Sequence, residues 1–312
     1  MQNLKVDEAT FKSERAVVEE EYRQRVLAPP YGRFFNGIAA VSYLEHPYKR
    51  PGIGSIEDLE ASSLADVVDF HKRHYRPDNA TLIVAGDFDE KQLDGWIDKY
   101  FGAVPKPAAP LPHFEATEPP WPRDRTASLS GPQVPLPAVA ITWLAPPTTS
   151  PDAPALQVAA AVLSSGESSR LNQSLVYRQR IATAAGFSTD LRVGPGLLIA
   201  YAIAAGGKPT SELTAALLAE VTRLATTPPT PAELAKVKIQ IVTGAFISRQ
   251  TPLGLASALG DAAVLEGNAA RINTDLEDLQ KVSAADVQRV LRRYLLEAHK
   301  VTIEYRQQEG GK

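Results

Sequence analysis

The spacing of apolar and polar residues divides the chain into two successive runs of secondary structure. Apolar residues that recur every three or four positions predict helices, and short apolar blocks between turn residues predict strands. In the first run we expect a helix up to about Val26, a polar and glycine-containing loop, a helix over 56–74, a strand over 80–88 and a helix over 89–102.

The second run continues the same alternation. It is expected to hold strands over 138–145, 183–190, 196–205 and 300–305, and helices over 152–164, 168–180, 210–226 and 275–295, with a long helix from about Pro231. The two strands between 183 and 205 follow each other like a hairpin, which favours a mostly antiparallel sheet with helices on one face. The predicted fold class is therefore α+β, an α/β sandwich-like arrangement.

A proline-rich stretch between Val104 and Pro137 separates the two runs. Proline breaks helices and disfavours central strands, so this stretch is expected to lie over the surface. It predicts a first domain over 1–110, a linker over 111–124, a second domain over 125–308 and a tail over 309–312.

Composition narrows the possible functions. The 312 residues are 44% hydrophobic, which suffices for two cored domains, and the net charge of −3 gives no reason to expect nucleic acid or an anionic membrane as partner. The chain has no cysteine, so any metal must be held by histidine and carboxylate side chains. No signal-like apolar segment or span of about 18 apolar residues occurs, and we expect a soluble chain.

An internal repeat is the most informative feature of the sequence. Residues 56–84 align with residues 276–304 without a gap, at a constant offset of 220 positions. Two unrelated helix–strand units could resemble each other by chance, but identities in register favour a duplication. The identical pairs include Glu57 with Glu277, Asp58 with Asp278, Leu59 with Leu279, Ser63 with Ser283, Ala65 with Ala285, Asp66 with Asp286, Val67 with Val287 and Arg73 with Arg293.

The repeat also predicts that the first domain is incomplete. If the second unit begins at its first strand near Arg125, the first unit should begin roughly 95 positions ahead of Met1. We therefore expect two homologous domains, each a mostly antiparallel sheet packed with helices, of which only the second is complete in this chain.

Two histidine-containing segments resemble metal-binding patterns. Residues 42–46, "SYLEH", differ from the inverted zinc motif H-x-x-E-H at the first position, but Pro47 disfavours the continuous helix that this motif needs. We expect a turn there. His71 and His74, three positions apart in "HKRH", are expected at a solvated helix end rather than on a metal.

Several segments resemble the pitrilysin/insulinase family of zinc metallopeptidases. They include "ERAVVEEEYR" (14–23), "HPYKRPGIGSIEDLEASSLADVVDFHKRHYRPDNATLIVAGDFD" (46–89), "KYFGAVPKP" (99–107) and "PPTPAELAKVKIQIVTGAF" (228–246). They cover nearly the whole chain in the family's order. The chain is similar to the short bacterial branch, in which each polypeptide has two related α/β domains and two polypeptides close into a clamshell.

The resemblance implies one zinc ligand in this chain. The family binds Zn²⁺ through two histidines of H-x-x-E-H and a downstream Glu, which follows a supporting acidic residue by seven positions in E-x-x-V-V-x-x-E. Glu14, Val17, Val18 and Glu21 match that pattern. Glu21 thus corresponds to the third zinc ligand and Glu14 to the supporting residue. Seven residues make two helical turns, so both share one face, although such a charged run is more often simply solvated.

The same resemblance places other site residues outside the chain. The H-x-x-E-H would lie ahead of Met1, and the second domain has no histidine at the equivalent place. Family members also carry an Arg and a Tyr seven positions apart that hold the substrate, and these positions fall on Val176 and Thr183. We therefore expect a homologous partner subunit that bears the Arg/Tyr pair, with a peptide or unfolded polypeptide as substrate.

The sequence thus predicts a zinc-dependent metalloendopeptidase subunit that is inactive alone, because it lacks the H-x-x-E-H segment. In the intact family enzyme, the Glu of that motif acts as general base on a zinc-bound water. The alternative is a non-catalytic core or scaffold subunit of a processing-peptidase-like assembly. The resemblance implies a periplasmic or secreted protein, and a cytoplasmic one stays open.

Overall fold

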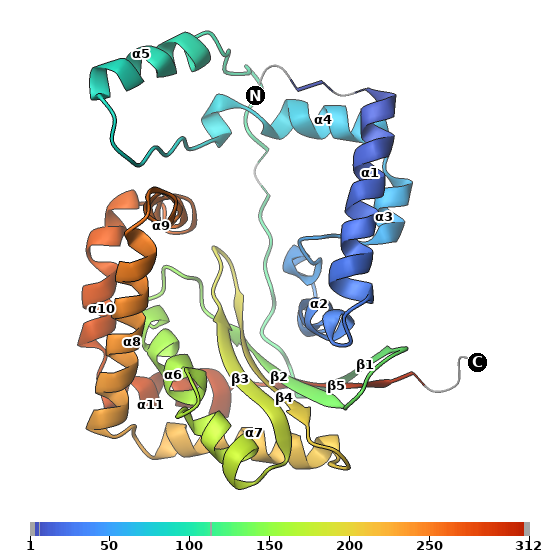
Figure 1. The fold of residues 1–312 in the computed structure, drawn as a ribbon, viewed down its shortest axis with the longest axis vertical. Helices are drawn as coiled ribbons and strands as arrows, with labels where there is room; N and C mark the ends of the chain where they lie inside the picture. The colour runs from blue at the N-terminus through green and yellow to red at the C-terminus, as the bar shows by residue number, and fades with distance from the viewer. Residues whose placement is uncertain (1–3, 6, 113, 309–312) are drawn as a thin grey trace.

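The computed structural model describes residues 4–5, 7–112 and 114–308, and the expected tail over 309–312 lies outside them. Within residues 4–5 and 7–112 the chain is helical and forms no strand (Figure 1). Its helices are α1 (Glu8–Tyr22), α2 (Gly32–Ser42), α3 (Ile56–Ala61), α4 (Leu64–His74) and α5 (Glu90–Phe101), with shorter turns η1 (Arg23–Leu27), η2 (Pro47–Lys49) and η3 (Pro77–Asn79).

The second part contains a sheet and its covering helices. The strands are β1 (Arg125–Gly131), β2 (Ala138–Ala145), β3 (Ala182–Asp190), β4 (Gly196–Ala204) and β5 (Lys300–Gln307). The longer helices are α6 (Ala153–Ser164), α7 (Thr210–Thr226), α8 (Pro231–Arg249), α9 (Pro252–Leu265), α10 (Asp275–Lys281) and α11 (Ala284–Leu291). Shorter helical segments are η4 (Asn172–Arg178), η5 (Ala269–Asn273) and η6 (Arg292–Leu296).

The five strands form one mixed sheet in the order β1-β5-β2-β4-β3. Only β1 and β5 run parallel, with Arg125 opposite Val301, and the other three neighbouring pairs are antiparallel. The prediction of a mostly antiparallel sheet packed with helices is therefore confirmed for the second part. The helices were expected on one face, but α2 covers the other face as well.

Both faces of the sheet are covered, which explains why β2 is apolar at nearly every position. Val139, Ile141 and Trp143 face the core that α6, α7 and α11 close. Ala138 and Ala140 point to the opposite face and belong to a second core, to which the first part contributes Phe34, Ile38 and Tyr43.

Helix α2 corrects one sequence prediction. The segment between Val26 and Ile56 was expected as a loop, but residues 32–42 form a helix that packs on β1, β2 and β5. Phe34 and Ile38, four positions apart, are buried there. Local propensity did not indicate this helix, because Gly32, Gly37 and the polar residues around them favour a loop. Packing against the sheet outweighs that local propensity.

Two further predictions in the first part need correction. The helix expected over 56–74 is two helices, because Ser63 accepts a hydrogen bond from Asp66 N and caps a new helix. The strand expected over 80–88 is not formed. Ala80 is extended, yet no strand pairs with this segment among residues 4–5, 7–112 and 114–308.

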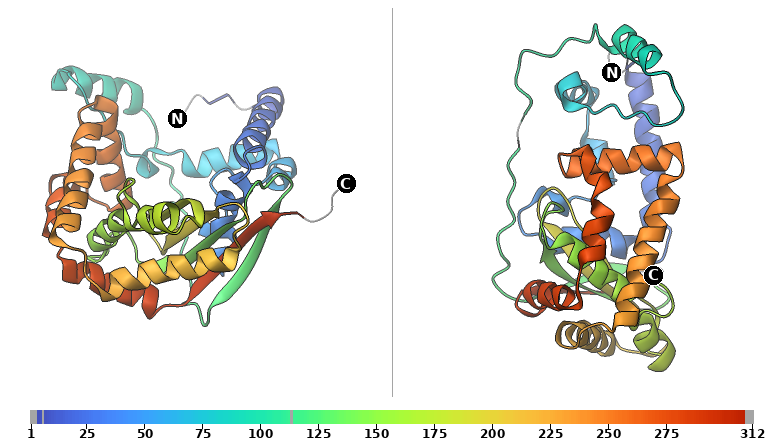
Figure 2. Two further views of the ribbon diagram at one scale, coloured as in Figure 1. Left: turned by 60° about the horizontal axis from the view of Figure 1, so that its bottom comes forward. Right: turned by 90° about the vertical axis from the view of Figure 1, so that its left-hand side faces the viewer.

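The linker connects the two ends of the molecule. Residues 103–112 and 114–124 run along one side between α5 and β1 (Figure 2), and Glu118 anchors them by accepting hydrogen bonds from the backbone of Leu44, Glu45 and His46. None of the helices in the described residues has the length and apolar character that crossing a bilayer requires.

Candidate functional site

Helix α1 carries the two carboxylates that the sequence singled out. Asp7 begins the helix by accepting a hydrogen bond from Thr10 N at 2.8 Å, and no residue of α1 is buried. Glu14 and Glu21 lie two turns apart on this helix. The structure thus brings the two carboxylates to one exposed face.

The contacts of the two carboxylates differ. Glu21 Oε1 lies 2.7 Å from Arg25 Nη1, one turn further along the chain, and the Glu21 side chain is 39% exposed. Glu14 is exposed and forms no ion pair with any other described residue. The carboxylate of Glu21 is therefore held only by a neighbour within the same helical segment, an exposed pairing of small energy.

A shallow hollow of 650 Å³ runs beside Glu21. It is lined by Ser13, Ala16, Val17, Glu20, Glu21, Gln24 and Arg25, all of them on α1 or the turn after it. Because one helical segment alone forms its floor, the hollow has no opposite wall in the described residues. Glu21 is thus presented at a surface and not inside a pocket.

The donors around Glu21 do not by themselves fit a zinc ion. Catalytic zinc sites take three protein ligands, and Glu21 offers one carboxylate. No group of three or more histidine, aspartate or glutamate side chains that could hold a metal occurs among residues 4–5, 7–112 and 114–308.

The structure confirms the turn expected at "SYLEH" and differs from the solvated helix end expected at His71 and His74. Helix α2 ends at Ser42, and His46 is extended and accepts a hydrogen bond from Tyr48 N at 3.1 Å, so "SYLEH" is a turn. His71 and His74 lie in the last turn of α4 and are only partly exposed. His71 stacks on Tyr75 at 4.9 Å, and its Nε2 atom is buried without a hydrogen-bond partner among the described residues.

The positions expected for a substrate-binding Arg and Tyr are occupied by Val176 and Thr183. Val176 packs against the main core, and Thr183 lies exposed near the start of β3, where its Oγ1 donates to Ile203 O at 3.4 Å. Neither side chain carries a charge. These two positions cannot hold an oxyanion as an Arg/Tyr pair would.

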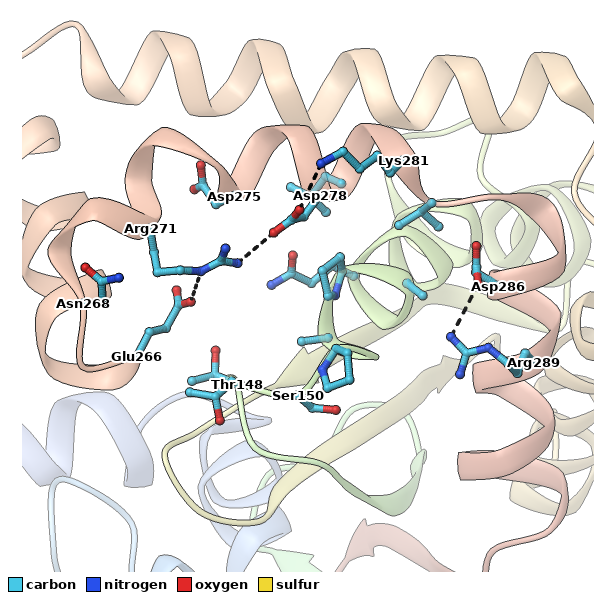
Figure 3. A pocket seen from close by; sticks show the side chains of 18 residues that line it. Thr148, Ser150, Glu266, Asn268, Arg271, Asp275, Asp278, Lys281, Asp286 and Arg289 are labelled. Carbon is cyan, nitrogen blue, oxygen red and sulfur yellow. Dashed lines mark hydrogen bonds and ion pairs between the residues drawn. The ribbon is translucent and has the colours of Figure 1, made fainter.

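The structure also forms a cleft that the sequence did not indicate. It has a volume of 710 Å³ and lies between the loop that precedes α6 and the η5–α10 region (Figure 3). Arg271 crosses it, with Nε 3.1 Å from Glu266 Oε2 and Nη2 3.0 Å from Asp278 Oδ2. These contacts raise the pKa of Arg271 through the hydrogen bonds to Glu266 and Asp278.

A buried carboxylate stabilises the wall of this cleft. Asp152 is 7% exposed and accepts hydrogen bonds from Arg289 Nη1 at 2.6 Å, Arg293 Nη1 at 3.2 Å and Tyr294 Oη at 2.9 Å. Burial alone would raise the pKa of Asp152, but the hydrogen bonds from Arg289 and Tyr294 and the two positive charges outweigh it and lower that pKa. Of the cleft and its wall, the identical pairs of the repeat in the sequence include Asp278, Leu279, Asp286 and Arg293 but not Asp152.

The basic side chains that line the cleft form ion pairs with carboxylates. Arg271 and Arg289 are paired as described, and Lys281 lies 3.6 Å from Asp278. Every basic side chain that lines the cleft thus has a carboxylate partner. No basic side chain among those that line the cleft is therefore left without a carboxylate partner.

Comparison with known proteins gives the family. The family model described as "Peptidase M16 inactive domain" matches residues 62–241. The zinc protease PqqE of Helicobacter pylori is 29% identical over 311 residues, which is 96% of this chain and 67% of that protein. The mitochondrial-processing peptidase subunit beta of Saccharomyces cerevisiae is 28% identical over 108 residues, which is 34% of this chain and 23% of that subunit.

Solved structures share the whole fold. A protease from Helicobacter pylori superposes with a TM-score of 0.90 at 25% identity and covers 97% of this chain and 73% of its own. A peptidase M16 inactive domain from Pseudomonas fluorescens gives 0.84 at 14% identity and covers 98% and 72%. The arrangement of the two parts is therefore shared with M16-like peptidases.

Proposed function

The chain belongs to the peptidase M16 inactive-domain family, and we propose that it is a subunit of a zinc-dependent metalloendopeptidase that hydrolyses peptides. The observation that carries the proposal is the pair Glu14 and Glu21 on one face of α1, in the spacing E-x-x-V-V-x-x-E. The likeness to a zinc protease over 96% of the chain supports it.

In this proposal Glu21 supplies one carboxylate ligand to Zn²⁺ and Glu14 supports it from the preceding turns. The exposed position of Glu21 supports this role, since a carboxylate held only by Arg25 can exchange that partner for a metal. One ligand does not hold a catalytic zinc. The other ligands must come from outside the described residues, and the chain by itself is expected to be inactive.

The proposed partner is a homologous subunit that carries the Arg/Tyr pair, because Val176 and Thr183 cannot supply it here. The relative from Saccharomyces cerevisiae is itself described as a subunit, which supports an assembly of related chains. The proposed substrate is a peptide or unfolded polypeptide. We propose a periplasmic or secreted location with it, and fractionation of native cells would distinguish this from the cytoplasm.

The first test is an assay of the isolated chain. A pure sample with added Zn²⁺ should not cleave a casein-derived peptide, because Glu21 is the only zinc ligand assigned to it. Zinc-dependent cleavage that a chelator stops would contradict the proposed division of the site between chains.

The second test concerns Glu21 in the assembled protein. Zinc retained after dialysis should fall at least about tenfold in Glu21→Gln, since a neutral amide is a poor zinc ligand. Glu20→Gln, on the same helix and also beside the hollow, is the matched control and should retain zinc. Equal retention by both variants would remove Glu21 from the site.

A second candidate is a non-catalytic core or scaffold subunit. It is favoured by the family description, which names an inactive domain, and by the uncharged residues Val176 and Thr183. The same zinc measurement separates the two, because a scaffold would bind no zinc in the assembly and Glu21→Gln would change nothing.

A further inference from the structure

A buried histidine lies where the first part of the chain meets the sheet of the second. His46 begins the turn η2 and is 6% exposed. Its Nδ1 atom accepts a hydrogen bond from the backbone N–H of Tyr48 at 3.1 Å. Because a backbone amide nitrogen donates and does not accept, Nδ1 carries no proton, and the proton of the imidazole is on Nε2. The hydrogen bond therefore assigns His46 as a neutral imidazole.

This hydrogen bond shapes the turn. The backbone of His46 is extended, and its side chain caps the first residues of η2 as an Asn or Asp side chain commonly does. A protonated imidazole has N–H groups at both ring nitrogens, so its Nδ1–H would face the N–H of Tyr48. Protonation of His46 therefore removes the cap of the turn and the acceptor of the Tyr48 amide.

The loop between β3 and β4, residues 191–195, packs on the same turn. Tyr43 Oη donates to Pro195 O at 2.8 Å, and Tyr48 Oη accepts a hydrogen bond from Gly194 N at 3.4 Å. A Cβ added at Gly194 would lie 3.3 Å from His46 Nε2. The β3–β4 loop thus contacts the imidazole itself and the two tyrosines beside it.

Charged groups face His46 from the β3–β4 loop and from the linker. The Arg192 guanidinium lies 4.7 Å from the centre of the Tyr48 ring, and the centre of the His46 ring lies 4.1 Å from the same point. Arg192 is paired with Asp190, and the linker residue Glu118 accepts a hydrogen bond from the backbone N–H of His46. The charged neighbours of His46 in the sequence are Glu45, Lys49 and Arg50.

The partners of these charges oppose a charged imidazole. Asp190 is held by Arg192, and Glu118 accepts four N–H groups, three from the backbone and one from Trp121. No hydrogen bond joins either carboxylate to the His46 ring in the described residues. A positive charge on His46 would therefore meet that of Arg192 across one aromatic ring, and like charges repel.

We propose that His46 is a proton-sensitive latch between the first part of the chain and the β3–β4 loop. The latch is closed while the imidazole is neutral and opens when it takes up a proton. Histidine is the side chain that ordinarily changes its charge between about pH 5 and 8, so mildly acidic solution opens the latch. The inference does not depend on Glu21 or on zinc.

The latch is connected to the cleft shown in Figure 3. Arg192 O accepts a hydrogen bond from Thr148 N at 2.8 Å, and Thr148 lines that cleft. The contacts between His46 and Thr148 run through Tyr48 and Arg192. When the β3–β4 loop is released at His46, the wall of the cleft that carries Thr148 loses a support. Proton uptake in the first part is thereby coupled to the shape of a cleft in the second.

Hydrogen exchange on the full chain tests the latch. It is measured at pH 7 and about pH 5.5, with the rates corrected for the intrinsic effect of pH on exchange. Residues 46–50 and 191–196 should lose protection by roughly tenfold at the lower pH, while β2 keeps its protection. Glu118 does not cause this change, because its pKa lies below the ordinary 4.5. Equal protection at both pH values would overturn the proposal.

Two substitutions at His46 separate the proton from the hydrogen bond. His46→Asn keeps an acceptor for the Tyr48 amide but does not titrate, so residues 191–196 should stay protected at both pH values. His46→Ala removes the acceptor and should leave these residues unprotected at both. His299→Asn, at an exposed histidine beside Asp124, is the control and should keep the wild-type response. A pH response that persists in His46→Asn, or full protection in His46→Ala, would show that His46 is not the latch.

Discussion

Ser42 and Thr142, a hundred positions apart, share a hydrogen bond of 2.8 Å at a site where both residues are fully buried. Ser42 Oγ donates to Ile38 O at 2.7 Å, so the Thr142 hydroxyl is the donor to Ser42. This relay fixes the end of α2 to β2, the strand at the centre of the sheet. The first part of the chain is thereby attached to the core of the second.

Removing Ser42 should weaken the fold. Ser42→Ala leaves the Thr142 hydroxyl buried without an acceptor, which costs about 1 to 3 kcal/mol of unfolding free energy. Urea unfolding followed by circular dichroism measures it. Because Ser42→Ala with Thr142→Val removes both partners, the double variant should lose less than the sum of the two singles. A strictly additive result would show that the hydrogen bond contributes no coupling energy.

Glu118 should make stability depend on pH. Burial raises its pKa, but the N–H groups of Leu44, His46 and Glu45 and the Trp121 indole outweigh that effect and hold the pKa below the ordinary 4.5. A carboxyl whose folded pKa is lowered stabilises the fold above its ordinary pKa. That contribution is lost as the pH falls towards the folded pKa.

The matching experiment is Glu118→Gln. At pH 7 the variant should lose about 1.5 to 3 kcal/mol of unfolding free energy, since the acceptor of several backbone donors loses its charge. The loss should shrink as the pH falls below about 4.5. Glu45→Gln, on the exposed side of the same turn, is the control. A loss that stays constant down to pH 3 would exclude the charge of Glu118 as the cause.

Replacing Asp152, the buried carboxylate behind the wall of the cleft, should destabilise the fold. Asp152→Asn keeps the shape but removes the charge that Arg289 and Arg293 face, and we expect about 2 kcal/mol of destabilisation at pH 7. Because the pKa of Asp152 is lowered in the fold, the wild type should lose this contribution as the pH falls below the ordinary 3.8. Thermal unfolding with the exposed Asp261→Asn as control would measure it, and equal effects would argue against the ion pairs.

The two capping boxes offer a matched comparison. Ser283→Ala removes the cap of α11, whose Val287 and Val290 are buried, so global unfolding should become easier by about 1 kcal/mol. Ser63→Ala removes the same cap from α4, which buries no residue. It should speed hydrogen exchange in α4 and leave global unfolding unchanged. Equal global effects would mean that α4 is as tightly packed as α11.

Only the contacts of the candidate site that lie within one helical segment could be predicted from the sequence. Glu14 and Glu21 share a face because the helical period places them two turns apart, and Arg25 reaches Glu21 across one further turn. The ion pairs of Asp152 were not predictable, because Arg289 lies 137 positions away and no local rule joins the two. Sequence spacing cannot give a contact that two distant elements create by packing.

The sequence by itself determined the features that follow from the spacing of residues along the chain. The helical period that places Glu14 and Glu21 on one face of α1 and the apolar run of β2 are of this kind. Tertiary structure decided the rest. Residues 32–42 form a helix because Phe34 is buried against the sheet. Residues 80–88 form no strand in the described residues, because a strand exists only where another strand accepts its hydrogen bonds.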